Sequence, residues 1–158
     1  MNYVRQQVEH YGLAERSVLE VGSYDVNGSV RSLFRGKYLG IDQVGGPGVD
    51  MVLNAEKLTG FKWRFGVVVC TEVLEHCERP WLVVEQMARV LDVDGYLILT
   101  CRAYDARGAQ IDPGAHYGDY WRTSKAGLTL LFEDQGLTVL DCIEDPDSPG
   151  LLSVAHVQ

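Results

Sequence analysis

The chain alternates short continuous apolar runs with segments in which apolar residues recur every three or four positions. Continuous runs are typical of buried strands, and the second pattern is typical of amphipathic helices. Strands are predicted over residues 17–22, 37–42, 49–54, 65–71, 96–101, 137–144 and 151–157. Helices are predicted before Gly12, between Asn27 as N-cap and Gly36, from Pro80 onwards, and between Thr123 as N-cap and Gly136.

Strands that alternate with helices predict a parallel sheet with right-handed crossovers. The run at 65–71 is apolar on both faces, so this strand is expected at the centre of the sheet. The last two strands are joined by EDPDSPG without a helix, which predicts an antiparallel hairpin. The expected fold class is α/β: a doubly wound, mostly parallel seven-stranded sheet with helices on both faces and a C-terminal antiparallel hairpin. Residues 1–158 are expected to form one domain.

Composition and charge narrow the class of protein. With 46% hydrophobic and 23% charged residues, the chain is typical of soluble globular domains. No apolar run approaches the roughly 18 residues that span a bilayer, and the polar opening differs from a secretory signal, so the cytoplasm is the expected location. The net charge of −8 disfavours nucleic acid as a partner. The four cysteines lack CxxC spacing and are expected to be reduced, without a metal site.

The loop after the first strand, EVGSYDVNG, has features typical of a ligand-binding loop. A glycine at this turn lets the backbone approach a ligand closely. The pattern is not GxGxxG, because Tyr24 stands where a pyrophosphate would press on the backbone. Glu20 and Asp25 suit an ammonium or sulfonium group better than a phosphate. The alternative is a plain strand-to-helix turn.

The ends of two further predicted strands are expected to contribute to the same pocket. In doubly wound sheets, ligands bind beyond the carboxyl ends of the strands, so the loops after residues 22, 42, 54, 71 and 102 are expected to meet. Asp42, 20 positions after Gly22, can accept hydrogen bonds from both hydroxyls of a ribose, although it could equally be a solvated turn residue. Asn54 and Ala55 offer an amide and a backbone N–H to an adenine ring.

These residues resemble the class I S-adenosylmethionine-dependent methyltransferases, in the compact branch without a separate substrate domain. The resemblance covers nearly the whole chain. It rests on VLEVGSYDVNG, YLGIDQVGGPGVDMVLNAEKL, VVVCTEVLEHCERPWLVVEQMARVLDVDGYLILT and HYGDYWRTSKAGLTLLFEDQGL. The segment CTEVLEH, followed by a helix and DGYLILT, is its most specific part.

The resemblance implies S-adenosyl-L-methionine as cofactor and assigns its binding residues. Glu20, Gly22 and Ser23 would contact the methionine part, with Tyr24 beside them where many members have glycine. Asp42 would hold the ribose, Asn54 and Ala55 the adenine. The backbone around Thr71 and Glu72 would face the amino group and the sulfonium.

Methyl transfer from a sulfonium needs mainly the alignment of donor and acceptor, and a hydroxyl acceptor also needs a general base. His116, His76 and Glu72 are the candidates for that role, with His116 favoured. The segment of more than 20 residues after the strand at 96–101 is long enough to form a lid. Its side chains are expected to bind substrate, or alternatively to pack the loop onto the core: Tyr104, Tyr117, Tyr120, Trp121 and Arg122.

The favoured function is therefore methyl transfer to an oxygen or nitrogen of a small molecule, such as a sugar or natural product. A second hypothesis is a cofactor-binding regulatory or partner subunit without transferase activity. A third is an NAD-dependent enzyme on the same sheet, which the unsuitable phosphate loop disfavours. The sequence identifies neither the acceptor nor the oligomeric state.

Overall fold

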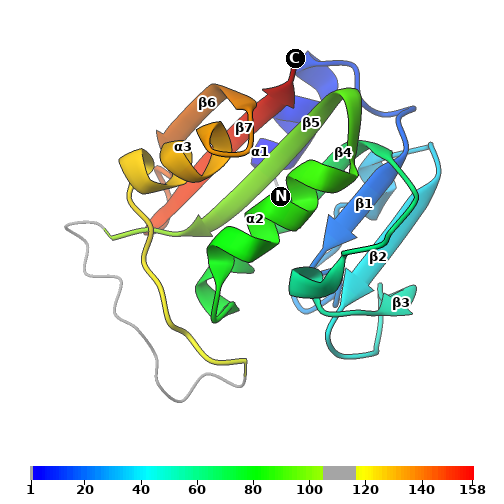
Figure 1. Ribbon diagram of the computed structural model, residues 1–158, viewed down its shortest axis with the longest axis horizontal. Helices are drawn as coiled ribbons and strands as arrows, with labels where there is room; N and C mark the ends of the chain where they lie inside the picture. Colours follow the sequence, from blue (N-terminus) through cyan, green and yellow to red (C-terminus); the bar gives the residue numbers. More distant parts are fainter. Residues whose placement is uncertain (1, 105–116) are drawn as a thin grey trace.

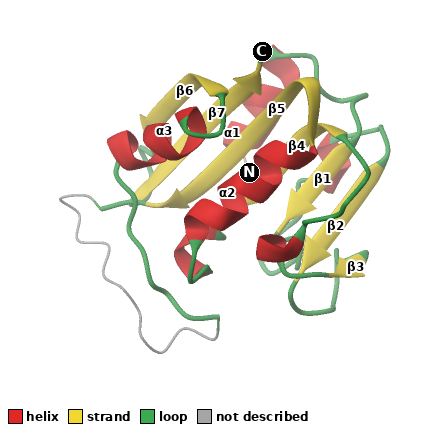
Figure 2. Ribbon diagram, in the orientation of Figure 1, coloured by secondary structure: helices red, strands yellow, loops and turns green. Residues whose placement is uncertain are grey.

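A seven-stranded sheet in the order β3-β2-β1-β4-β5-β7-β6 forms the centre of the computed structural model, which describes residues 2–104 and 117–158 (Figure 1). The strands are β1 (Val18–Val21), β2 (Tyr38–Asp42), β3 (Met51–Val52), β4 (Phe65–Thr71), β5 (Leu91–Arg102), β6 (Leu137–Glu144) and β7 (Gly150–Val157). The helices are α1 (Asn2–His10), α2 (Pro80–Val90) and α3 (Lys125–Glu133). Single helical turns are η1 (Arg31–Leu33), η2 (Ala55–Lys57) and η3 (Leu74–His76) (Figure 2).

The pairing of the strands confirms the predicted architecture. β3, β2, β1, β4 and β5 run parallel to one another, whereas β7 is antiparallel to both β5 and β6. β4 occupies the central position, with all residues from Phe65 to Cys70 buried. The strand expected over 49–54 is reduced to Met51–Val52, because it lies at the sheet edge and both residues are exposed.

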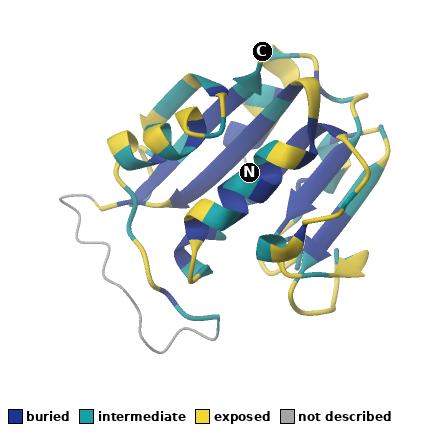
Figure 3. Cartoon of the chain, viewed as in Figure 1, coloured by how far each residue is buried: buried dark blue, intermediate teal, exposed yellow. Residues whose placement is uncertain are grey.

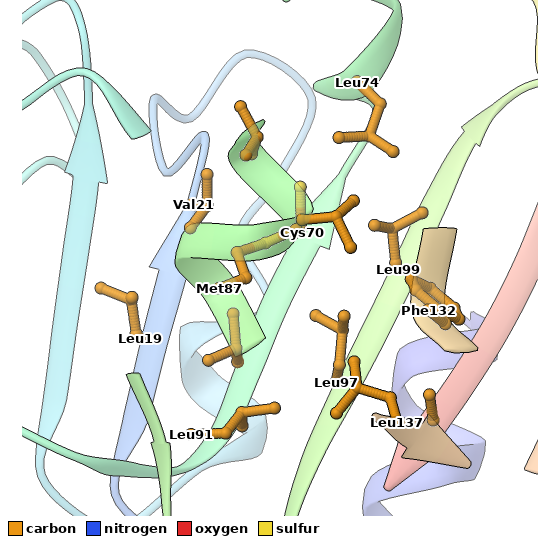
Figure 4. Packing of buried hydrophobic residues seen from close by; sticks show 14 of the residues in the cluster. Leu19, Val21, Cys70, Leu74, Met87, Leu91, Leu97, Leu99, Phe132 and Leu137 are labelled. Atoms are coloured by element: carbon orange, nitrogen blue, oxygen red, sulfur yellow. The ribbon is translucent and has the colours of Figure 1, made fainter. Parts of the chain in front are cut away.

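Helices cover both faces of the sheet, as predicted. Alternate β4 residues point to opposite faces, so that Val68 and Cys70 contact the cluster under α2 and α3, and Val67 and Val69 the cluster under α1. Figure 4 shows Cys70, Met87 and Phe132 within the first of these clusters. The central strands are accordingly buried on both sides (Figure 3).

The helix expected between Asn27 and Gly36 is wrong: the structure has only the turn η1 there. Side chains satisfy the backbone locally, because Asp25 Oδ1 accepts from the N–H of Gly28 at 2.7 Å and Ser29 Oγ from that of Arg31 at 3.1 Å. Such bonds compete with a regular helix. Val30 is nonetheless buried, so the periodic pattern located the core contact but not the helix.

Two details of the other helices differ from expectation. The N-cap of α3 is Ser124, whose Oγ accepts from the N–H of Gly127 at 3.1 Å, because Thr123 instead forms a bridge with Ala103. Helical periodicity assigns Gln86 to the polar side of α2, yet it is buried. α2 contacts η2, η3 and α3 as well as the sheet, so more than one stripe of this helix is covered. Within the described ranges, no helix has the length and apolarity needed to cross a membrane.

Candidate active site

The loops after β1, β2, β3, β4 and β5 meet at the carboxyl edge of the sheet, as expected. They enclose a cavity of about 1200 Å³ that is lined from Glu20 and Asp42 on one side to Arg102 on the other. Ligand sites commonly measure about 300–1000 Å³. The cavity therefore has room for a nucleoside-sized molecule and a second ligand beside it.

The loop after β1 is held against the loop after β4 at Gly22. Gly22 has a φ of +79°, and a Cβ atom there would lie 2.2 Å from Cγ2 of Val73. Only glycine satisfies both the conformation and the close approach. Ser23, the next residue, is buried and lines the cavity, and its Oγ has no hydrogen-bond partner among the described residues.

Glu20 presents a buried carboxyl group to the cavity. Its Oε2 accepts a hydrogen bond from the hydroxyl of Tyr38 at 2.8 Å. The guanidinium of Arg31 lies 4.5 Å from the centre of the Tyr38 ring and pairs with Asp50. Burial raises the pKa of Glu20, although Tyr38 and Arg31 act in the opposite direction. A cation in the cavity would compensate this buried carboxylate.

Asp42 lines the cavity and also organises the two loops around it. Its Oδ1 accepts from the N–H of Val44 at 3.0 Å and its Oδ2 from that of Tyr24 at 3.3 Å. Asp42 therefore stabilises the turns as one of the two alternatives predicted, and its contact with a ribose stays a prediction. The Tyr24 ring rests on Gly46, where a Cβ atom would lie 2.1 Å from the ring atom Cε2.

Asn54 and Ala55 lie at the same end of the cavity. Asn54 Oδ1 accepts from the N–H of Glu56 at 2.8 Å and so caps η2. This cap uses the oxygen of the side-chain amide and leaves its NH₂ group to other partners.

The end of β4 carries the residues that face the middle of the cavity, Thr71 and Glu72. Glu72 has a φ of 53°, an uncommon backbone conformation for a residue other than glycine. Its Oε1 accepts from Thr100 Oγ1 at 2.9 Å, and its Oε2 lies 3.2 Å from Nε of Arg102. Two residues at the end of β5 thus hold this carboxylate in place.

The structure separates the expected substrate-binding residues. Tyr117, Tyr120 and Arg122 line the cavity. Tyr104 is 81% exposed and does not line it. Trp121 is also outside the cavity wall: its Nε1 donates to the carbonyl of Cys77 at 2.9 Å and its ring packs edge-on against Trp81, which corresponds to the packing alternative.

Of the two candidate histidines, the structure describes His76. His116 lies outside the described residues. His76 lines the cavity, and its Nδ1 donates to the carbonyl of Gly118. A carbonyl can only accept, so in the neutral ring the proton is on Nδ1, and Nε2 is left as a proton acceptor.

Several cavity residues were not expected from the sequence. Glu75 in η3 is 2% exposed, and its pKa is raised by burial first and by the neighbouring Glu72 carboxyl second. Asp119 forms a two-point ion pair with Arg122, at 2.7 Å for Nη2 to Oδ2. Glu75 stands inside CTEVLEH, but its burial depends on tertiary packing that no local pattern reveals.

Comparisons with known proteins agree with this geometry. A family model described as a methyltransferase domain matches residues 12–99. No curated protein matches the chain.

Solved structures share the fold across almost the whole chain. The 1,6-didemethyltoxoflavin-N1-methyltransferase of Burkholderia thailandensis, with bound 1,6-didemethyltoxoflavin and S-adenosylhomocysteine, has a TM-score of 0.78 at 17% identity, over 99% of this chain and 77% of that one. Magnesium protoporphyrin IX methyltransferase of Synechocystis PCC 6803 with bound SAM has a TM-score of 0.69 at 16% identity, over 99% and 77%. N-methyltransferase NodS of Bradyrhizobium japonicum WM9, in complex with S-adenosyl-L-homocysteine, has 0.70 at 16%, over 99% and 86%.

The solved structures establish the fold, and the family model establishes the relationship. It spans more than half of the chain and includes the loops after β1, β2, β3 and β4 that build the cavity. The chain therefore belongs to the methyltransferase domain family, with the class I fold of the S-adenosylmethionine-dependent enzymes that its motifs predict.

Proposed function

We propose that this protein transfers a methyl group from S-adenosyl-L-methionine to an oxygen or nitrogen atom of a small molecule. The observation that carries the proposal is the single cavity at the carboxyl edge of the sheet, in which the buried Glu20 and the loop-bound Asp42 lie at one side. The cofactor would occupy the part formed by β1, β2 and η2. The acceptor would enter beside the ends of β4 and β5.

The residues present fit the cofactor on chemical grounds. The buried Ser23 Oγ has no partner among the described residues and can hydrogen-bond a ligand, and the buried Glu20 carboxylate suits the ammonium of the methionine part. Asp42 would accept from the ribose hydroxyls, and the NH₂ group of Asn54 and the N–H of Ala55 would contact adenine. Gly22, Tyr24 and Thr71 would shape the walls, with Glu72 near the reacting end. When bound, the cofactor supplies a methyl group activated by the sulfonium.

The chain's own contribution to catalysis is alignment and, for a hydroxyl acceptor, removal of a proton. Holding two reactants in near-attack geometry can supply a large part of the roughly 7–11 kcal/mol available from proximity. His76 Nε2, with its tautomer fixed by Gly118, and the Glu72 carboxylate are the described groups suited to accept that proton. Tyr117, Tyr120 and Arg122 would contact the acceptor.

Calorimetric titration with S-adenosylmethionine and S-adenosylhomocysteine tests the cofactor assignment. Asp42→Ala is expected to weaken binding by about 1–3 kcal/mol, the cost of losing charged hydrogen bonds. The control is Asp92→Ala, which removes an exposed carboxyl group at the beginning of β5, outside the cavity wall. Equal affinity of Asp42→Ala and the wild type would remove Asp42 from the site.

A screen for methyl transfer to alcohols, phenols and amines then tests the activity itself. Turnover that requires the cofactor supports the transferase proposal. Tight cofactor binding without turnover on any acceptor class would favour the regulatory or partner subunit instead.

A further inference from the structure

The cavity wall beside β4 and β5 has a surplus of acidic groups, and it is the part left for the acceptor if the proposed function holds. The described residues there provide four carboxyl groups and two guanidinium groups: Glu72, Glu75, Asp119, Asp145, Arg102 and Arg122. Glu72 follows β4, Glu75 is in η3 and Arg102 ends β5. Asp119 and Arg122 belong to the segment 117–122 before α3, and Asp145 to the turn before β7.

Both guanidinium groups of this wall are already engaged with carboxylates. Arg102 Nε lies 3.2 Å from Glu72 Oε2, and Arg122 forms the two-point pair with Asp119. No surplus positive charge is left among the described lining residues on this side to hold a phosphate or carboxylate. This wall therefore selects against an anionic acceptor.

Glu75 is the second, independent observation. Its side chain lines the cavity although the residue is only 2% exposed, and its Oε2 has no hydrogen-bond partner among the described residues. A buried carboxyl oxygen without a partner is costly, and a ligand that donates a hydrogen bond or carries a positive charge relieves that cost. The aromatic rings of Tyr117 and Tyr120 line the same part of the cavity and suit a cation.

The charged and titratable groups around Glu75 come from every neighbouring element. Glu72 raises its pKa and Arg102 lowers it, while burial has the largest effect and raises it. The charge of Glu75 raises the pKa of Arg122 and the pKa values of three thiols, those of Cys70, Cys77 and Cys101. The pKa values of Cys77 and Cys101 are raised to about 12, so these thiols stay protonated near neutral pH.

We infer that the methyl acceptor is an amine, whose nitrogen binds the adjacent carboxyl groups of Glu72 and Glu75. The bound ammonium first gives one proton to the Glu75 carboxylate, and the lone pair thus freed forms the new N–C bond while the S–C bond of the cofactor breaks and its electron pair returns to sulfur. Glu75 then releases this proton to solvent, which restores its carboxylate. The raised pKa of Glu75 brings it closer to the pKa of an amine, which favours this transfer.

The test uses protein saturated with S-adenosylhomocysteine and three probes of one shape: benzylammonium, benzyl alcohol and benzoate. We expect benzylammonium to bind about tenfold more tightly than benzyl alcohol, the value of a hydrogen bond to a charged group, and benzoate to bind least. Glu75→Gln keeps the shape of the side chain and is expected to abolish the preference. The matched control Glu133→Gln removes an exposed carboxyl group at the end of α3, outside the cavity wall, and is expected to retain the preference.

A measurement without any variant provides a second test. Binding of the ammonium ion displaces the proton of Glu75, so its observed binding enthalpy should differ between phosphate and Tris buffers, whereas that of benzyl alcohol should not. The inference is overturned if benzylammonium fails to bind, if the alcohol or benzoate binds equally well, or if Glu75→Gln retains the preference or Glu133→Gln loses it. Failure to bind S-adenosylhomocysteine would instead count against the proposed function, which is thereby tested separately.

Discussion

Tyr38→Phe isolates the contribution of one hydroxyl group to cofactor binding. The hydroxyl donates to Glu20 Oε2 at 2.8 Å, while the ring packs beside Phe34 and under Arg31. The variant keeps the ring and its packing and removes only the hydrogen bond. Glu20 then has a buried carboxyl group without its nearest donor.

The expected magnitude follows from that loss. A hydrogen bond to a charged group contributes about 1.5–3 kcal/mol, and since Tyr38 is only half-buried we expect about 1.4 kcal/mol, a tenfold weaker affinity for S-adenosylmethionine near pH 7. The Tyr38 bond lowers the pKa of Glu20, so its removal raises that pKa further. The deficit should therefore be largest at low pH and decrease as pH rises, because a higher pKa keeps a larger fraction of Glu20 protonated at any given pH.

Calorimetric titration between pH 6 and pH 8 measures this effect with three ligands. S-adenosylmethionine and S-adenosylhomocysteine share the ammonium group and should lose affinity equally, whereas adenosine lacks it and should bind as before. Tyr96→Phe, at a tyrosine outside the cavity wall, is the matched control. Wild-type affinity of Tyr38→Phe at every pH, or an equal loss for adenosine, would refute the assignment of Glu20 to the ammonium.

Three further outcomes are expected. Because the folded state raises the pKa of Glu75 from 4.5 to about 8, the wild-type free energy of unfolding should fall as pH rises between these values, and urea denaturation of Glu75→Gln should show a weaker pH dependence. Gly46→Ala should displace the Tyr24 ring and weaken adenosine binding severalfold, and adding Tyr24→Ala should restore part of it. Trp121→Ala should reduce stability in urea by about 1 kcal/mol through loss of the edge contact with Trp81, yet leave cofactor affinity unchanged.

The sheet could be predicted from the sequence because each parallel strand is a continuous apolar run with a turn at its end. The run at 65–71, for example, has the same bounds in the structure. The segment at 27–36 could not, because the spacing of Val30, Leu33 and Phe34 fits a helix and a buried turn equally well. What decided between them was the local bonding of Asp25 and Ser29, and no apolar pattern records such bonds.

The sequence predicts which residues line the cavity when they stand at the end of a parallel strand, as Asp42 and Thr71 do. Partners that depend on strand register were missed. Glu20 pairs with Gly40, which brings Tyr38, two residues earlier on β2, to the same face as the carboxyl group. In strands covered on both faces, hydrophobic alternation does not specify this register, so the sequence did not reveal the contact.

The reversed direction of β7 affects how the border of the cavity beside β5 is built. Its first residue, Gly150, pairs with Arg102 at the end of β5, so the tight turn before it, with Asp145 and Ser148, borders the acceptor side of the cavity. A parallel strand in this place would need a crossover of a dozen or more residues. A short hairpin tip can instead change in sequence or length without disturbing the parallel strands, so this border of the cavity is open to substitution at little cost to the fold.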